Sequence, residues 1–139
     1  MGMITMNLIR ASQASKKHVE HFADTNDGID KESLYQAGYV AVVDEKIEGC
    51  FILDPVEEGF YWLKQLYITR DRANQLPFLL EAILTLAKEQ QAKGVYVHSH
   101  QPTVDIILEA LQFHPQNENA LVDKYPVNQG NWWSYRVSS

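Results

Sequence analysis

The sequence has few of the residues that mark secreted, fibrous, repetitive or membrane-spanning chains. Cys50 is the only cysteine, so no disulfide can form within the chain, which agrees with a reducing compartment. Seven glycines and five prolines are too few for linkers or low-complexity segments, and no segment repeats with a fixed period. No apolar run approaches the roughly 20 residues of a membrane helix, and Met3–Ile9 is too short for a signal peptide's apolar region. We therefore expect a cytoplasmic protein without a membrane partner.

Positive charge is also scarce. Asp and Glu outnumber Lys and Arg by 18 to 12, which gives a formal net charge of -6. A surface of this sign repels polyphosphates, so we expect no nucleic-acid partner. It would suit an amine-bearing ligand, although mild acidity also serves simply to keep a protein soluble. The charge alone selects no function.

The length and the hydrophobic pattern predict a single domain over residues 1–139. A chain of 139 residues with 45% hydrophobic content normally buries one core. Runs rich in β-branched and aromatic residues predict strands at Met6–Arg10, Tyr39–Val43, Ile47–Leu53 and Phe60–Ile68. Two helices are predicted between the first two strands, one capped by Ser12 and one near Asp30–Ala37, separated by a turn-rich loop at Asp24–Gly28.

The second half of the chain alternates helices and strands. Apolar residues recur at three- and four-residue spacing from Leu76 to Ala87 and again after Pro102, which predicts two amphipathic helices. Strands are predicted at Val95–His100, Ala120–Asp123 and Trp132–Val137. A strand, helix and strand in succession indicate a crossover between parallel neighbours, so the sheet is expected to be mixed.

Short motifs accompany this order of elements. Met6–Ala11 ends in Ile-Arg-Ala, Tyr39–Gly49 contains Val-Ala-Val-Val-Asp-Glu-Lys-Ile-Glu-Gly, and Leu66–Ile68 reads Leu-Tyr-Ile. With the helix, strand and helix of Leu79–Phe113, they resemble the GNAT acyltransferase superfamily, whose hairpin commonly reads Val-Ala-x-x-Asp-Gly-x-x-Val-Gly. The resemblance covers nearly the whole chain. It implies an α/β (α+β) fold with a mixed, mostly antiparallel central sheet and helices on both faces.

The same resemblance implies a site for acetyl-CoA at the end of the fourth strand. In the family, the pantetheine arm of the cofactor pairs with the backbone of that strand. The pyrophosphate rests on amides of the following loop, at a helix N-terminus. Carried over by position, the implied cofactor-binding residues are Leu66, Tyr67, Ile68, Arg70, Arg72, Ala73, Asn74, Gln75 and Leu76.

The loop departs from the family's usual Arg/Gln-x-x-Gly-x-Gly/Ala pattern. Glycine lets the backbone close around phosphate oxygens, yet the corresponding segment Asp71–Leu76 contains none. We expect Asn74 to cap the following helix, with Pro77 in its first turn. Arg70 and Arg72 are expected either to hold phosphate through their side chains or to lie in a solvated loop.

The residues that usually handle protons in the family are absent as well. Acyl transfer to an amine needs a base, a donor that polarises the thioester carbonyl and an acid for the thiolate. The strand position that often holds Glu lies in Leu63–Leu66, and the helix position that often holds Tyr is Leu108. The candidate catalytic residues are therefore His98, His100 and Tyr67. The alternatives are that the histidines are structural and that the tyrosine packs in the sheet, and with no third ligand evident we expect no metal site.

Three functions are compatible with these features. The first is an N-acetyltransferase that uses acetyl-CoA and the amine of a small molecule or peptide. The second is a non-catalytic GNAT-like binding or regulatory domain, and the third is a domain that mainly forms a homodimer through its aromatic C-terminal strands. The remaining conspicuous side chains are expected to pack or to be solvated: His18, His21, Cys50, Trp62, Trp132 and Trp133.

Overall fold

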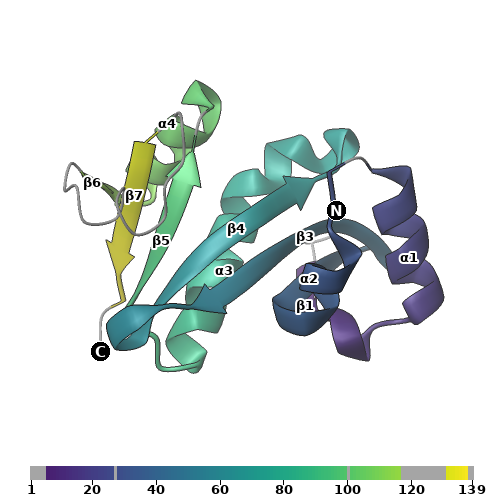
Figure 1. Ribbon diagram of the computed structural model, residues 1–139. Helices are drawn as coiled ribbons and strands as arrows, with labels where there is room; N and C mark the ends of the chain where they lie inside the picture. Colours follow the sequence, from purple (N-terminus) through teal and green to yellow (C-terminus); the bar gives the residue numbers. More distant parts are fainter. Residues whose placement is uncertain (1–5, 27, 100, 117–130, 138–139) are drawn as a thin grey trace. The chain divides into compact units, whose positions relative to one another are not determined.

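The computed structural model describes residues 6–26, 28–99, 101–116 and 131–137 (Figure 1). Its sheet has seven strands in the order β1-β2-β3-β4-β5-β7-β6. The strands are β1 (Met6–Arg10), β2 (Gly38–Val43), β3 (Lys46–Pro55), β4 (Phe60–Ile68), β5 (Gly94–Ser99), β6 (His114–Gln116) and β7 (Asn131–Arg136). β4 and β5 are parallel, whereas β2 pairs antiparallel with β1 and β3, and β7 with β5 and β6. The expected mixed, mostly antiparallel α/β fold is confirmed.

The helices follow the predicted order. The α-helices are α1 (Lys16–Thr25), α2 (Lys31–Ala37), α3 (Leu76–Glu89) and α4 (Pro102–Ala110). The short 3-10 helices are η1 (Ala11–Gln13), η2 (Glu57–Gly59) and η3 (Arg70–Gln75). None of the helices in the described ranges has the length and apolarity needed to cross a membrane.

Contacts along the chain separate two compact units, each assembled from segments that are distant in sequence. Unit 1 consists of Met1–Asp54 and Lys64–Ala82, and unit 2 consists of Pro55–Leu63 and Ile83–Ser139. The strand β4 and the helix α3 each contribute one part to either unit. The residues implied as cofactor contacts all belong to unit 1.

In unit 1, β1, β2 and β3 form an antiparallel meander. The pairs run from Met6 with Val43 to Arg10 with Tyr39, and β2 continues into β3 through a two-residue turn closed by the pair Val43 and Lys46. Every residue of β2 is buried except Val42, so both faces of this strand are covered. β-branched and aromatic residues suit such a strand because both of its faces pack.

The helices of unit 1 pack on a core that includes Val19, Phe22, Leu34, Val40 and Cys50. The predicted cap at Ser12 is wrong, because residues 11–13 form η1 and the α-helix begins later, where the Ser15 side chain accepts a bond from the His18 amide. Asp30 caps α2 by accepting bonds from two amides of its first turn. The second helix therefore begins where the sequence predicted it.

In unit 2, the first part of β4 pairs in parallel with β5, from Phe60 with Gly94 to Leu63 with Val97. β5 then pairs antiparallel with β7, and both Trp132 and Trp133 of β7 are buried. The Trp133 indole donates a hydrogen bond to the Asp105 carboxylate at 3.0 Å. The tryptophans thus pack as expected. The predicted strand Ala120–Asp123 lies outside the described residues, and the short β6 was not predicted.

Candidate functional site

The end of β4 provides the backbone that the sequence analysis assigned to a cofactor. Leu66, Tyr67 and Ile68 are its last residues, and each is half-buried. They lie beyond Leu63, the last residue of β4 in the parallel register with β5. Just before them, Gln65 has φ 52°, a left-handed conformation that bends a strand and is uncommon for a residue with a Cβ. The strand is therefore kinked immediately before the candidate site.

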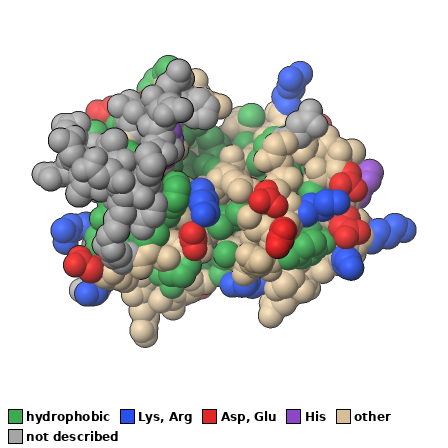
Figure 2. Space-filling model, in the orientation of Figure 1, with side chains coloured by type: hydrophobic (Ala, Val, Ile, Leu, Met, Phe, Trp, Pro, Cys, Tyr) green, Lys and Arg blue, Asp and Glu red, His purple; other side chains and the backbone are tan. Residues whose placement is uncertain are grey.

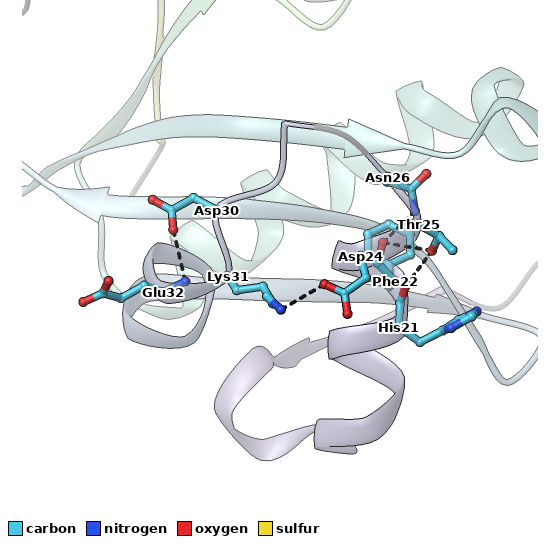
Figure 3. Close-up of polar contacts among 8 residues, drawn as sticks. All are labelled: His21, Phe22, Asp24, Thr25, Asn26, Asp30, Lys31 and Glu32. Atoms are coloured by element: carbon cyan, nitrogen blue, oxygen red, sulfur yellow. Dashed lines mark hydrogen bonds and ion pairs between the residues drawn. The ribbon is translucent and has the colours of Figure 1, made fainter.

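The Tyr67 side chain is held against α1. Its hydroxyl donates a hydrogen bond to Asn26 Oδ1 at 2.5 Å, and its ring meets the Phe22 ring edge-on, with centroids 5.7 Å apart. The Asn26 amide is itself fixed, since Nδ2 donates to the Phe22 carbonyl at 2.8 Å (Figure 3). The Tyr67 proton therefore points at Asn26, while the lone pairs of the hydroxyl oxygen remain able to accept another bond. Asn26 was not among the predicted site residues.

The segment after β4 is helical, which corrects one expectation. Asn74 does not cap α3, because it lies inside η3, and the helical path already starts after Thr69. Pro77 does lie in the first turn of α3, as predicted. Without glycine, none of residues 70–76 adopts a positive φ, so the segment winds into a helix instead of opening into a phosphate-binding loop.

Because this segment winds into η3, backbone amides that could bind a phosphate instead donate hydrogen bonds to backbone carbonyls. The Arg72 amide donates to the Thr69 carbonyl at 3.0 Å, and the Leu76 amide donates to the Ala73 carbonyl. Pro77 has no amide hydrogen. Asn74 is exposed, and the buried Gln75 has an acceptor, Oε1, without a hydrogen-bond partner among the described residues. An acceptor of this kind does not attract phosphate, so the segment does not fit the amide cradle that the family resemblance implies.

The Arg72 guanidinium is committed to two carboxylates of the β2–β3 hairpin. Its Nε donates to Glu48 at 2.8 Å and its Nη2 donates to Asp44 at 3.0 Å. The hydrogen bond to Glu48 is the main cause of a raised pKa for Arg72, with Asp44 adding to it. The Thr69 amide also donates to the Glu48 carbonyl. Arg72 therefore holds η3 to the hairpin, and Arg70, which is exposed and has no ion-pair partner in the described ranges, is the loop arginine left to meet a phosphate.

Only one of the two histidines predicted as bases, His98, lies in the part of the chain that the structure describes. His98 lies on β5 in unit 2, half-buried, with its ring 5.3 Å from the Trp132 ring. His100 lies outside the described residues. Within the described ranges, no three or more His, Cys, Asp or Glu side chains gather in a group that could hold a metal ion.

A pocket of about 480 Å³ lies within unit 1 between α1, the β2–β3 turn and the residue after β4. We call it the turn pocket. Its polar lining comes from His18, His21, Thr25, Asn26, Glu45, Lys46 and Thr69. Figure 3 shows the His21 side chain extending away from the nearby Asp24–Lys31 ion pair, which closes at 2.9 Å. Sequence analysis had placed both histidines on a solvated face, and both are indeed exposed, but they border a hollow.

Charges of both signs are mixed on one face of the molecule. On the face shown in Figure 2, Lys and Arg side chains are interspersed with Asp and Glu, and no patch of a single sign gathers among the described residues of that face. This face therefore presents no broad field of one sign to a ligand.

The turn that borders the pocket is conformationally strained. Its two residues, Asp44 and Glu45, have φ of 51° and 68°, as a two-residue turn of type I′ requires. Asn, Asp and Gly are favoured at such positions, so Asp44 suits the turn, whereas the longer side chain of Glu45 is disfavoured at positive φ. The family hairpin quoted above has glycine where this chain has Glu45. The sequence shows this difference from the family, but only the structure shows that Glu45 must adopt a positive φ in the turn.

We expect Glu45→Gly to raise the free energy of unfolding by about 1 kcal/mol, because glycine adopts positive φ without strain. Urea denaturation of the variant and the parent protein measures the difference. A matched control is Glu58→Gly, since Glu58 also has a positive φ, of 57°, but lies in unit 2. A loss of stability at Glu45 with a gain at Glu58 would show that the Glu45 side chain stabilises the turn.

Comparison with solved structures identifies the fold. An acetyltransferase of the GNAT family from Staphylococcus aureus Mu50 superposes with a TM-score of 0.72 at 16% identity, covering 96% of this chain and 100% of that one. A GNAT family acetyltransferase from Elizabethkingia anophelis with acetyl-CoA bound gives a TM-score of 0.64 at 19% identity, covering 96% of this chain and 97% of that one.

A third similar structure is longer than this chain. N-acetylglutamate synthase from Neisseria gonorrhoeae, complexed with coenzyme A and N-acetyl-glutamate, gives a TM-score of 0.75 at 13% identity, covering 99% of this chain but 36% of that one. No protein-family sequence model matches the chain, and no curated protein matches it. At these identities the similarity establishes the fold, which is that of GNAT acetyltransferases.

Proposed function

We propose that this GNAT-fold chain transfers an acetyl group from acetyl-CoA to the amine of a small molecule or peptide. The observation that carries the proposal is the match over nearly the whole chain to acetyltransferase structures, including structures with coenzyme A or acetyl-CoA bound. The fold by itself does not specify a reaction, so the residues at the end of β4 must supply the rest of the argument.

The backbone of Leu66, Tyr67 and Ile68 would hold the extended arm of acetyl-CoA, which supplies an acyl group activated as a thioester. The kink at Gln65 reorients the backbone just before these residues, and a backbone amide there would polarise a carbonyl. Arg70 would meet the phosphates as an exposed side-chain charge. Because η3 offers no amide cradle, the phosphate end of the ligand is held less firmly than its arm.

Tyr67 is the side chain on β4 best placed to orient an incoming amine. Asn26 fixes the direction of its hydroxyl hydrogen, which leaves the oxygen to accept a hydrogen bond from the amine, whereas the hydroxyl proton is engaged with Asn26 and does not point at a leaving thiolate. The Phe22 ring packs against the Tyr67 ring and limits its movement. Asn26 is thus a positioning residue for Tyr67. The role of His98 as a base stays a prediction.

A second candidate function is binding without acetyl transfer, and the geometry of η3 favours it. The segment that should open around a pyrophosphate is a closed helix, and one of its two arginines already pairs with both Glu48 and Asp44. A domain with this segment can retain the fold while binding a different ligand or a partner. The affinity for coenzyme A decides between the two candidates.

Calorimetry with acetyl-CoA and with CoA should show binding that is weak and that falls as salt is raised, because an exposed arginine is screened more than backbone amides. Arg70→Gln should weaken binding about fivefold, a change typical of one exposed charged contact. Arg72→Gln is the matched control and should change affinity less, since Arg72 is already paired. Tight binding with an affinity that does not change with salt concentration would show that the amides of this segment do hold phosphate.

The double variant Asn74→Gly with Leu76→Gly tests whether the phosphate end of the CoA site is present but blocked by the helical segment. Glycine at both positions allows the backbone to open, at a stability cost of about 1 kcal/mol for each glycine in a helix. We expect CoA affinity to rise in the folded double variant. If a folded double variant gains no affinity and neither protein acetylates a panel of amines, the binding function replaces the enzymatic one.

A further inference from the structure

We propose that the turn pocket binds a free amino acid with an apolar side chain. The pocket has a volume of about 480 Å³, within the usual range for small-ligand sites, and combines apolar and polar walls. It lies entirely in unit 1 and is not lined by Leu66, Tyr67 or Ile68. The proposal concerns binding, and it does not depend on acetyl transfer.

Two opposite charges at the pocket have no protein partner. Glu45 and Lys46 are exposed, both line the pocket, and neither forms an ion pair or side-chain hydrogen bond with another described residue. Neighbouring carboxylates already have partners: Asp24 pairs with Lys31, and Asp44 shares Arg72 with Glu48, which leaves one net negative charge on those three side chains. Adjacent charges of opposite sign complement a ligand that carries an ammonium and a carboxylate close together. A simple amine or a simple acid would gain one attraction and meet one repulsion.

Hydrogen-bond donors also line the pocket beside Lys46. Thr69 borders the pocket, but its Oγ1 is buried and has no hydrogen-bond partner in the part of the chain that the structure describes, so this hydroxyl would meet a ligand oxygen only after a shift of the side chain. The imidazoles of His18 and His21 add further N–H donors along the α1 wall.

The rest of the lining is apolar. The Phe22 ring, which is 6% exposed, and the half-buried Ile47 side chain both border the pocket. Burial of a branched aliphatic side chain against them would add the usual hydrophobic gain. Together with the two charges, this lining selects an amino acid such as leucine over glycine.

The strain at Glu45 supports a role in binding. A residue with a long side chain is held at φ 68°, where glycine would be more stable. Strain of this kind is concentrated at functional sites, and relieving it commonly costs function. Replacing Glu45 by glycine would remove the carboxylate that faces the pocket. The turn therefore combines a less favourable backbone with a side chain suited to an ammonium group.

The test is an NMR titration of the full chain with L-leucine, 3-methylbutylamine and 4-methylpentanoate. The last two compounds keep the leucine skeleton but lack the carboxylate or the ammonium group. We expect leucine to shift the amides of His21, Lys46 and Thr69, and each analogue to bind about fivefold more weakly, as the loss of one exposed charged contact implies. Glu45→Gln and Lys46→Gln should each weaken leucine binding about fivefold, while Glu89→Gln and Lys88→Gln, at residues that do not line the pocket, should not change it.

Glu45→Gly and Glu58→Gly separate binding from folding. Both relieve a positive φ, yet only the Glu45 variant should lose leucine binding. The proposal is overturned if leucine causes no shifts at the pocket, if either analogue binds as well as leucine, or if Glu45→Gly binds leucine like the parent. An absence of acetyl transfer would leave each of these results unchanged.

Discussion

Gly49→Ala is expected to lower the free energy of unfolding by about 2 kcal/mol and to displace β4 at Tyr67. A Cβ at this position of β3 would lie 2.7 Å from the Tyr67 carbonyl oxygen and 3.6 Å from Ile68 Cα. The obstructing atom belongs to the backbone of a neighbouring strand, so it cannot rotate away as the end of a side chain would. Urea denaturation gives the loss, and the Asn26 side-chain amide signals report the displacement of Tyr67.

A second substitution identifies the contact responsible. The Ala41 side chain would lie 3.6 Å from the new Cβ, which is an ordinary contact, so Ala41→Gly should not rescue Gly49→Ala. At an unstrained position, glycine to alanine normally stabilises a protein by 0.4–1 kcal/mol. A gain of that size at Gly49 would show that β3 and β4 do not approach so closely.

Stability should also fall between about pH 9 and pH 12 because of Cys50. Burial of the thiol raises its pKa from 9.0 to about 12. Above pH 9 the unfolded chain releases this proton while the folded chain keeps it, so each added pH unit favours unfolding. At 1.36 kcal/mol for each pH unit, the loss reaches about 4 kcal/mol once the folded thiol also ionises.

Cys50→Ala is the matched control, because it removes the thiol and retains a small apolar side chain. The variant starts from a lower stability, since it leaves a small cavity, but its decline above pH 9 should be shallower than that of the parent. Tyrosines and lysines titrate equally in both proteins, so the difference between the two slopes isolates the thiol. Identical slopes would mean that water reaches Cys50 in the folded state.

Most of the fold follows from local sequence patterns. The strand predicted at Phe60–Ile68 matches the bounds of β4, and the hairpin of β2 and β3 lies within two residues of its prediction. These elements were predictable because β-branched and aromatic residues fill strands that are buried on their faces. The same patterns predicted the order of the remaining elements, and that order, together with short motifs, underlies the GNAT resemblance. Its confirmation by structural comparison rests on that same order, since identity is only 12–19% for several of the similar structures.

The candidate site was harder to predict because its contacts join distant segments. Tyr67 and Asn26 are separated by 41 positions, and Arg72 is separated from Asp44 by 28. No local pattern shows that an arginine expected to meet phosphate will instead pair with carboxylates of a hairpin. Local propensity identified Pro77 as an early helical residue, but it did not show where the helix starts.

The Asp44–Glu45 turn has a consequence for the rate at which unit 1 folds. A β-hairpin closes in microseconds when its turn residues favour the required conformation. Glu45, held at positive φ, opposes that closure, so β2 and β3 remain unpaired for longer in the unfolded chain. The meander is complete only when both edges of β2 are paired, one with β1 and the other with β3. Unpaired strand edges promote association between chains, and the turn thereby controls how long nascent molecules are exposed to aggregation.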